Sequence, residues 1–396
     1  MNGESGYMKN IMFLANSYGS YMGGIYYIKN MVYALANCEN SATRFRIYIL
    51  TAEDCAEEFI HLLTKENVFL IHYSNKGFVR IVRKLRNIFY KRVCHKTINE
   101  YLDSKIVKDY AIDVIYPLYQ DVRFQEKGIL WIPDFQHFHY PQFFGDKVAC
   151  ESLEADERKL VQIANTIILS SQDCYKDFMK YYGDLRKNVA VVPFVSELEV
   201  EEDNISILTK YNLPSKFFIV SNQFYVHKNH ITVFRAIAEL VKRNRTDIKV
   251  IFTGQLEDYR NPQYIAELKS IINEHGTEQN IRILGLIPRK EQLSLIRKSI
   301  AVIQPSLFEG WSTIVEDAKS MHKNIILSDI DVHLEQKVEN GIYFQKENYM
   351  ELAEIMEKVW DGVISFPDSN YNYKEKAKEY GNIFANVLER YIYKDE

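Results

Sequence analysis

The chain has 396 residues, 47% of them apolar and 26% charged, a composition typical of a globular protein with about two or three domains. The net charge of −4 excludes the strong basic field expected of a nucleic-acid-binding protein. The five cysteines are widely spaced and form no C-x-x-C pair, which predicts a reducing compartment and no structural zinc. No apolar run reaches the roughly 18 residues of a membrane span, and the amino-terminal sequence lacks the pattern of a secretion signal. We therefore expect a cytoplasmic protein.

Short apolar runs alternate with helical patterns through the first half. The expected strands cover residues 9–15, 46–50, 68–72, 113–117, 128–132, 166–169 and 189–193. This alternation predicts a parallel sheet covered by helices on both faces, as in a Rossmann-like domain. Gly23 and Gly24 lie between the first strand and a helix expected over residues 25–37. They could approach a phosphate or sugar, or form an ordinary turn.

A basic amphipathic helix is expected over residues 77–98. Its apolar residues follow helical spacing, basic residues lie between them, and no acidic residue occurs from Lys76 to Asn99. Such a helix can lie on an anionic membrane surface, and we consider this contact through residues 78–98. The alternative is a helix whose apolar face meets the core and whose basic face is solvated.

A histidine-containing loop follows the strand expected at 128–132. It should lie at the carboxyl edge of the sheet, where doubly wound folds bind ligands. We expect His137 to contact a sugar or to act in catalysis, although it could also be a structural histidine. Asp134 and His139 could join it in a metal site, but three ligands in one short loop are weak evidence, and we expect no metal.

The second half repeats the alternation after an acidic stretch, residues 197–203, that lies near the expected linker. The expected strands cover residues 216–221, 248–253, 281–284, 301–304, 324–327 and 342–344. Lys228 follows the first of these strands and comes just before a helix expected near residues 230–243. A mobile cation beside free helix N–H groups suits a pyrophosphate, although a surface lysine is the alternative.

The segment from Pro305 to Asp317 is the most informative part of the sequence. It joins the strand at 301–304 to a helix that Ser312 or Thr313 can cap. Gly310 allows the backbone to approach a ligand closely, and the free N–H groups at the helix start favour an anion.

Two acids flank this anion site. Glu309 and Asp317 are eight residues apart, and their carboxylates can accept hydrogen bonds from the hydroxyls of a sugar or a ribose. A phosphate between two hydroxyl-binding acids indicates a nucleotide-sugar.

This acid pair resembles the E-x7-E motif of the group-1 (family 4) retaining glycosyltransferases of the GT-B fold, with aspartate in the second place. In that family the first acid contacts the donor sugar and the second the ribose; Glu316, adjacent to Asp317, could substitute. Many members carry an arginine where this chain has Gln223, which leaves Lys228 as the main cation. The SNQF, HKNH, IPDFQH and EGWST stretches resemble a subgroup that assembles polysaccharides and O-antigens.

The resemblance spans nearly the whole chain and implies an α/β fold with two Rossmann-like domains facing across a cleft. It implies an acceptor domain over residues 1–196, a donor domain over 197–365 and a helix over 366–396 that returns to the first domain. The implied catalytic residues are His137, Lys228 and Glu309. The implied donor-binding residues are Gly23, Gly24, Gln223, Lys228, Gly254, Glu309, Gly310, Trp311, Ser312, Thr313 and Asp317.

The expected activity is hexosyl transfer from a nucleotide-diphosphate sugar to a glycan or polyprenyl-linked acceptor in cell-surface polysaccharide synthesis. It would proceed with retention and without a metal or other cofactor. The expected location is the cytoplasm, and we consider the inner face of the cell membrane as the place of work there. The alternatives are a GT-B epimerase or phosphorylase, or a non-catalytic sugar-nucleotide-binding subunit of a membrane assembly complex.

Overall fold

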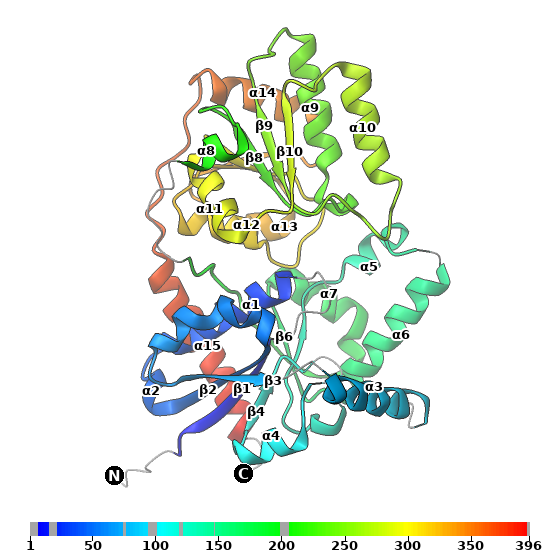
Figure 1. Cartoon of the computed structure of the whole chain (residues 1–396), viewed down its shortest axis with the longest axis vertical. Coiled ribbons are helices and arrows are strands. Elements are labelled where there is room, and N and C mark those ends of the chain that lie inside the picture. The colour runs from blue at the N-terminus through cyan, green and yellow to red at the C-terminus, as the bar shows by residue number, and fades with distance from the viewer. Residues whose placement is uncertain are drawn as a thin grey trace. The chain divides into compact units, whose positions relative to one another are not determined.

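The computed structural model describes residues 7–15, 22–73, 77–93, 101–118, 122–145, 147–198 and 206–393. The chain divides into two compact units (Figure 1). Unit 1 comprises Met1–Phe135, Glu151–Glu197 and Lys374–Glu396, whereas unit 2 comprises Gln136–Cys150 and Leu198–Tyr373. The segment 136–150, which the sequence places in the amino-terminal domain, therefore groups with the second unit.

Unit 1 is built on parallel strands. Its first sheet has the order β3-β2-β1-β4 and its second the order β5-β6-β7. A parallel bridge between Ile115 and Gly128 connects the two sheets. The strands are β1 (Lys9–Ala15), β2 (Phe45–Ala52), β3 (Val68–Tyr73), β4 (Val114–Tyr116), β5 (Leu130–Ile132), β6 (Thr166–Leu169) and β7 (Asn188–Val191). Each coincides with a strand expected from its apolar run.

Helices connect these strands. They are α1 (Met22–Ala36), α2 (Ser41–Arg44), η1 (Glu53–Thr64), α3 (Gly77–Arg92), α4 (Ser104–Asp109), η2 (Val122–Phe124), α6 (Lys147–Ile163), α7 (Gln172–Tyr182) and η4 (Gly183–Leu185). Helix α1 begins at Met22, so Gly23 and Gly24 lie in its first turn and not in the loop that we expected. First-turn N–H groups need no partner within the helix, which makes glycine less disruptive there than in a helix interior.

The carboxyl-terminal helix α15 (Tyr373–Ile392) packs on unit 1, as the resemblance implied. Its Phe384 ring meets the rings of Phe13 and Tyr116, with centroids 6.1 and 5.0 Å away. At Gly381 the helix comes so close to α1 that an added Cβ atom would lie 2.1 Å from the carbonyl oxygen of Ala34. Only glycine fits this contact without a backbone shift.

Unit 2 contains one six-stranded parallel sheet with the order β10-β9-β8-β11-β12-β13. This is the doubly wound Rossmann order, in which the direction of winding reverses between the first and fourth strands. The strands are β8 (Phe218–Ser221), β9 (Val250–Thr253), β10 (Ile281–Gly285), β11 (Ala301–Gln304), β12 (Ile325–Ser328) and β13 (Gly341–Phe344). All six were expected from the sequence.

The helices of unit 2 cover both faces of this sheet. They are α5 (Gln136–His139), η3 (Pro141–Phe143), α8 (Ser206–Tyr211), η5 (Val226–Lys228), α9 (His230–Lys242), α10 (Tyr264–His275), α11 (Arg289–Lys298), α12 (Thr313–Ser320), α13 (Asp331–Glu335) and α14 (Tyr349–Trp360).

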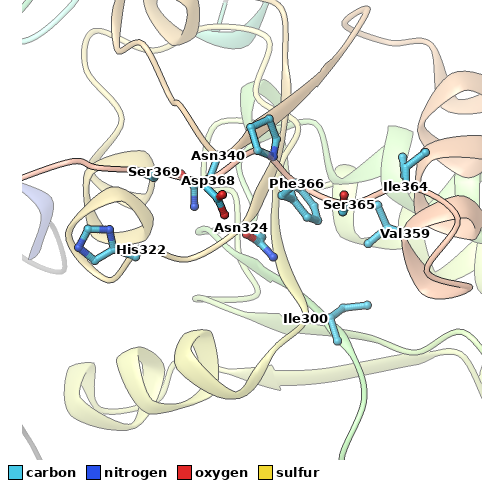
Figure 2. A pocket seen from close by; sticks show the side chains of 11 residues that line it. Ile300, His322, Asn324, Asn340, Val359, Ile364, Ser365, Phe366, Asp368 and Ser369 are labelled. Carbon is cyan, nitrogen blue, oxygen red and sulfur yellow. The ribbon is translucent and has the colours of Figure 1, made fainter.

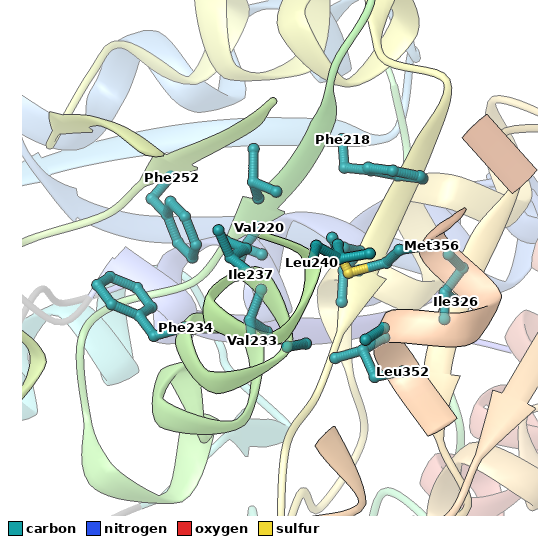
Figure 3. Close-up of a cluster of buried hydrophobic side chains, with 14 of the residues drawn as sticks. Phe218, Val220, Val233, Phe234, Ile237, Leu240, Phe252, Ile326, Leu352 and Met356 are labelled. Carbon is teal, nitrogen blue, oxygen red and sulfur yellow. The ribbon is translucent and has the colours of Figure 1, made fainter. Parts of the chain in front are cut away.

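Apolar side chains fill the space on each face. Phe218 and Val220 point to one face and pack with residues of α9 and α14, such as Leu240 and Met356 (Figure 3). Phe217 and the alternate strand positions point to the other face and pack with α11 and α12. Burial of each large apolar side chain contributes about 1.5–3 kcal/mol, so this double core makes the sheet a rigid support for the loops at its edges.

We predict that Gly381→Ala destabilises unit 1, even though alanine is the better helix former by about 1 kcal/mol. The new methyl group would overlap the Ala34 carbonyl, and relieving such an overlap costs about 1–3 kcal/mol. Thermal unfolding should show a lower midpoint for this variant. Asn386→Ala, on the exposed side of the same helix, is the matched control and should unfold like the wild type. An unchanged midpoint for Gly381→Ala would contradict the close packing.

Candidate functional site

The loops that follow β8 and β11 meet at the carboxyl edge of the unit 2 sheet. Asn222 donates to the Gln304 side chain over 2.7 Å, and Asn229 donates to the Pro305 carbonyl over 3.0 Å. The Leu307 amide donates to the His227 carbonyl over 2.8 Å. These bonds join the loop carrying Lys228 to the loop carrying Glu309, at the point where doubly wound sheets bind ligands.

Lys228 and Glu309 form an ion pair at this edge. The Lys228 ammonium lies 2.7 Å from both carboxylate oxygens of Glu309. The two side chains are 19% and 9% exposed, respectively. Gln304 and Ser306 also donate to the Glu309 carboxylate, over 2.9 and 2.7 Å. The sequence predicted a cation and an acid in this region; the structure brings them into direct contact.

Gly310, Trp311 and Ser312 lead from Glu309 into helix α12, and all three are buried. Ser312 occupies the N-cap position, but its side chain makes no capping hydrogen bond. Its hydroxyl instead accepts a hydrogen bond from Gln304 over 3.1 Å. Thr313, the first helical residue, is half-buried. The turn that we expected is thus present, and a side-chain network holds it in place.

Asp317 lies in α12, fully buried, with one carboxylate oxygen 2.5 Å from the Arg289 guanidinium. Arg289 also donates to Gln292 over 2.8 Å, and Gln292 donates to Ser221 at the end of β8 over 2.6 Å. This chain of contacts connects the start of α11 and the middle of α12 to the edge of the sheet.

Glu316, the residue before Asp317, contacts a different set of side chains. Its carboxylate bonds to Lys319, Gln336 and Tyr371, over 3.0, 2.9 and 3.2 Å. Burial raises the pKa of Glu316, and the Lys319 charge and the hydrogen bonds oppose that shift. Glu316 is therefore bound by these three partners, whereas the neighbouring Asp317 is the acid that contacts Arg289.

Gly254 follows β9 and brings two backbones together. Its φ is 132°, and an added Cβ atom would lie 2.0 Å from the Asn222 carbonyl oxygen. Its N–H donates to Gly285 over 2.9 Å. Gln223, next to Asn222, is half-buried in the same loop. The need for glycine here therefore follows from packing between loops of the sheet edge.

The His137 loop packs on the Glu309 loop within unit 2. The rings of His139 and Phe308 lie 4.9 Å apart, and Tyr140 donates to the Leu307 carbonyl over 3.4 Å. His137 itself is buried, and its burial, with a smaller contribution from the charge of His139, lowers its pKa to about 4. At neutral pH it is therefore an uncharged imidazole.

Other residues of this edge were missed by sequence reasoning: Arg289, Gln292, Gln304, Ser306 and His333. Gln304 is a polar residue at the carboxyl end of a buried strand, a signal that could have been used. The His333 Nδ1 donates to the Ser328 carbonyl over 2.9 Å and lies 3.2 Å from the Ser328 hydroxyl. Burial lowers the pKa of His333 to about 4. Arg289 has no motif spacing that relates it to Asp317.

Gly23 and Gly24 belong to unit 1 and the remaining site residues to unit 2. Within the described ranges, no group of three histidine, cysteine or acidic side chains could hold a metal ion. None of the described helices combines the length and apolar character needed to cross a bilayer.

A pocket of about 570 Å³ lies at the opposite, amino-terminal edge of the unit 2 sheet (Figure 2). Ile300, Asn324 and Asn340 line it immediately before β11, β12 and β13, and residues 364–369 cross it. None of the expected donor-binding residues lines this pocket.

Residues 203–380 match the family model described as Glycosyl transferases group 1. No curated protein matches the sequence significantly. Among solved structures, a glycosyltransferase from Rickettsia africae is similar, with a TM-score of 0.61, 16% identity and coverage of 98% of this chain and 100% of that chain. Anabaena HepE, solved with UDP and glucose, has a TM-score of 0.59 and 15% identity, covering 97% and 95%.

WaaG, a glycosyltransferase involved in lipopolysaccharide biosynthesis, has a TM-score of 0.53 and 10% identity, with 98% of each chain covered. At these identities the likeness establishes the fold. The chain has the GT-B fold, with two Rossmann-like α/β units, as expected from the sequence.

We predict that unit 2 loses stability below about pH 6.5 partly because it buries His230. Burial lowers the pKa of His230 to about 3, against about 6.5 in an unfolded chain. The neutral ring therefore stabilises the fold above pH 6.5, and this stability is lost as the pH falls toward 3. Between pH 6.5 and 5 the loss is up to about 2 kcal/mol.

His230→Phe should keep the stack on Phe224, whose ring centroid lies 4.2 Å away, and remove the proton-binding group. Thermal midpoints at pH 7.5 and pH 5 should therefore differ less for this variant than for the wild type. His275 is exposed, so His275→Gln is the control, and its thermal midpoint should fall between pH 7.5 and pH 5 by as much as that of the wild type. An equal acid sensitivity of His230→Phe would refute the assignment.

Proposed function

We propose that the protein is a retaining glycosyltransferase that moves a hexosyl unit from a nucleotide-diphosphate sugar to a glycan or lipid-linked glycan. The observation that supports this most is the contact between Lys228 and Glu309 at the switch point of unit 2. A cation suits the diphosphate and a carboxylate suits the sugar hydroxyls, so one pair provides for both halves of the donor. The group 1 family match covers most of this unit, and HepE was solved in complex with UDP and glucose.

The ion pair is then the resting state of the donor site. A diphosphate carries more negative charge than one carboxylate, so its arrival draws the flexible Lys228 ammonium toward it. Glu309 keeps its bonds from Gln304 and Ser306 and gains free acceptor capacity for sugar hydroxyls. Binding of the donor thus exchanges a protein–protein ion pair for two protein–ligand contacts.

Chemistry at this site is electrostatic. The bond between the anomeric carbon and the diphosphate oxygen breaks, and the acceptor oxygen forms its bond on the same face. The acceptor proton leaves with the diphosphate, whose growing charge Lys228 and the N–H groups at the start of α12 stabilise. No divalent metal takes part in this scheme, and the nucleotide-sugar is a co-substrate.

Arg289 supplies a second cation at the same edge. Gln223 is uncharged, but the Arg289 guanidinium lies on Asp317 and, through Gln292, next to the end of β8. We propose that Asp317 orients Arg289 toward the ribose and the phosphates. The carboxylate itself remains the expected ribose acceptor, now working beside the guanidinium.

His137 would face the reacting sugar as a neutral hydrogen-bonding group. Gly23 and Gly24 remain predicted contacts of the donor phosphates. Gly254, Gly310, Trp311, Ser312 and Thr313 would form the remainder of the donor site. We propose that the product enters a cell-surface polysaccharide and that the enzyme works on the cytoplasmic side of the membrane, where lipid-linked acceptors are presented.

We predict opposite binding effects for the two members of the pair. Isothermal titration with UDP, GDP, ADP and dTDP should identify a nucleoside diphosphate that binds the wild type. Lys228→Ala should weaken its binding about 10- to 100-fold, because a charged hydrogen bond is worth about 1.5–3 kcal/mol. Glu309→Ala should bind the diphosphate at least as well as the wild type, because Lys228 is released, but should lose transfer of the sugar.

Lys346→Ala is the matched control, since this exposed lysine follows β13 at the same edge. It should bind and transfer normally. Failure of every nucleotide to bind would contradict the proposed function. Conversion of the donor without an acceptor would indicate an epimerase. Formation of a sugar phosphate from inorganic phosphate would indicate a phosphorylase. Binding of the nucleotide without turnover would indicate a non-catalytic subunit.

A further inference from the structure

Helix α3 exposes its apolar face. Leu85 is 60% and Ile81 56% exposed, and the other described large apolar side chains of α3 and of Val93, which follows it, are between 44% and 62% exposed. The exposed residues are Val79, Ile81, Val82, Leu85, Ile88, Phe89 and Val93. Ile81, Leu85 and Ile88 follow a spacing of three or four residues and therefore share one side of the helix.

The polar face of the same helix packs against the rest of unit 1. The Arg83 guanidinium lies over the rings of Tyr73 and Tyr101, 5.5 and 5.8 Å from their centroids. Arg86 pairs with Asp103 over 3.8 Å, and the Arg123 guanidinium lies 5.9 Å from the Tyr90 ring. Residues 83, 86 and 90 recur at helical spacing on the side opposite Leu85.

This orientation is the reverse of the one expected for a surface helix of a globular protein, whose apolar stripe faces the core. The alternative interpretation of the sequence, a core-facing helix with a solvated basic face, is therefore wrong for the described side chains of α3. Residues 94–98 of the expected helix lie outside the described part of the chain. In Figure 1, α3 lies at the periphery of unit 1. A contiguous exposed apolar face of this kind marks a contact with something outside the chain.

The charges around this face identify the partner. Arg80, Lys84 and Arg92 are exposed beside the apolar residues, and residues 77–93 contain no acid. In a symmetric contact between two copies of α3, these cations would face each other and repel. An anionic lipid surface accepts the apolar side chains among its acyl chains and pairs the cations with its headgroups.

We propose that α3 is a membrane-docking helix that unit 1 holds by its cationic face, so that its apolar face enters the boundary of an anionic bilayer. Tyr73, Tyr101 and Asp103 form the bracket that fixes this orientation. The inference does not depend on the proposed chemistry, because it rests on α3 and its neighbours in unit 1 alone.

Flotation with lipid vesicles tests the proposal on the full-length protein. The wild type should float with vesicles of equal parts phosphatidylcholine and phosphatidylglycerol, and should remain unbound with phosphatidylcholine alone. A Leu85→Glu, Ile88→Glu double variant should bind at least about tenfold more weakly, because it places acids on the inserting face. Arg80→Gln with Lys84→Gln should bind weakly and with a reduced dependence on salt.

Val363→Glu is the matched control, since Val363 is 71% exposed in a turn of unit 2. This variant should float like the wild type, and the thermal midpoints of all variants should agree. The proposal fails if the wild type does not float with anionic vesicles, or if the α3 double variant floats as well as the wild type. It also fails if sedimentation shows that the wild type is a dimer and the α3 double variant a monomer, while both bind vesicles equally well.

Discussion

The carboxamide of Gln304 joins the two loops on which the candidate site depends. It is buried at the end of β11, where it accepts a hydrogen bond from Asn222 and donates toward Ser306, Glu309 and Ser312. Buried polar groups of this kind must be fully paired, because each unpaired one costs about 1–3 kcal/mol. The network therefore fixes how the loops after β8 and β11 lie against each other, and this arrangement brings Lys228 into contact with Glu309.

Two shielded ion pairs of unit 2 lie at the carboxyl edge of its sheet. The Lys228–Glu309 and Arg289–Asp317 pairs both place a cation against a shielded acid, and both lie beside the ends of β8 and β11. Paired in this way, the charges are tolerated before a ligand arrives. The His137 loop, although it comes from the first half of the sequence, contacts the same edge through Phe308 and Leu307.

The strands could be predicted because buried parallel strands are short apolar runs, as at residues 301–304, and their order follows from the fold. The loops at Lys228 and Glu309 could be predicted to meet, since both follow neighbouring strands. The pairing of Arg289 with Asp317 could not, because no periodicity relates them. The orientation of α3 could not be predicted from the sequence either. The spacing of its residues defines an apolar face, but the contacts with Tyr73, Tyr101 and Asp103 determine which face packs on the protein.

Hydrogen–deuterium exchange with and without the tightest-binding nucleoside diphosphate tests the central claim most directly, because it reports which backbone segments a ligand protects. The donor site at the carboxyl edge predicts slower exchange in peptides covering residues 222–229, 289–292 and 305–317, and unchanged exchange in residues 364–369. Protection confined to the opposite edge, in residues 322–324, 340 and 364–369, would contradict the account.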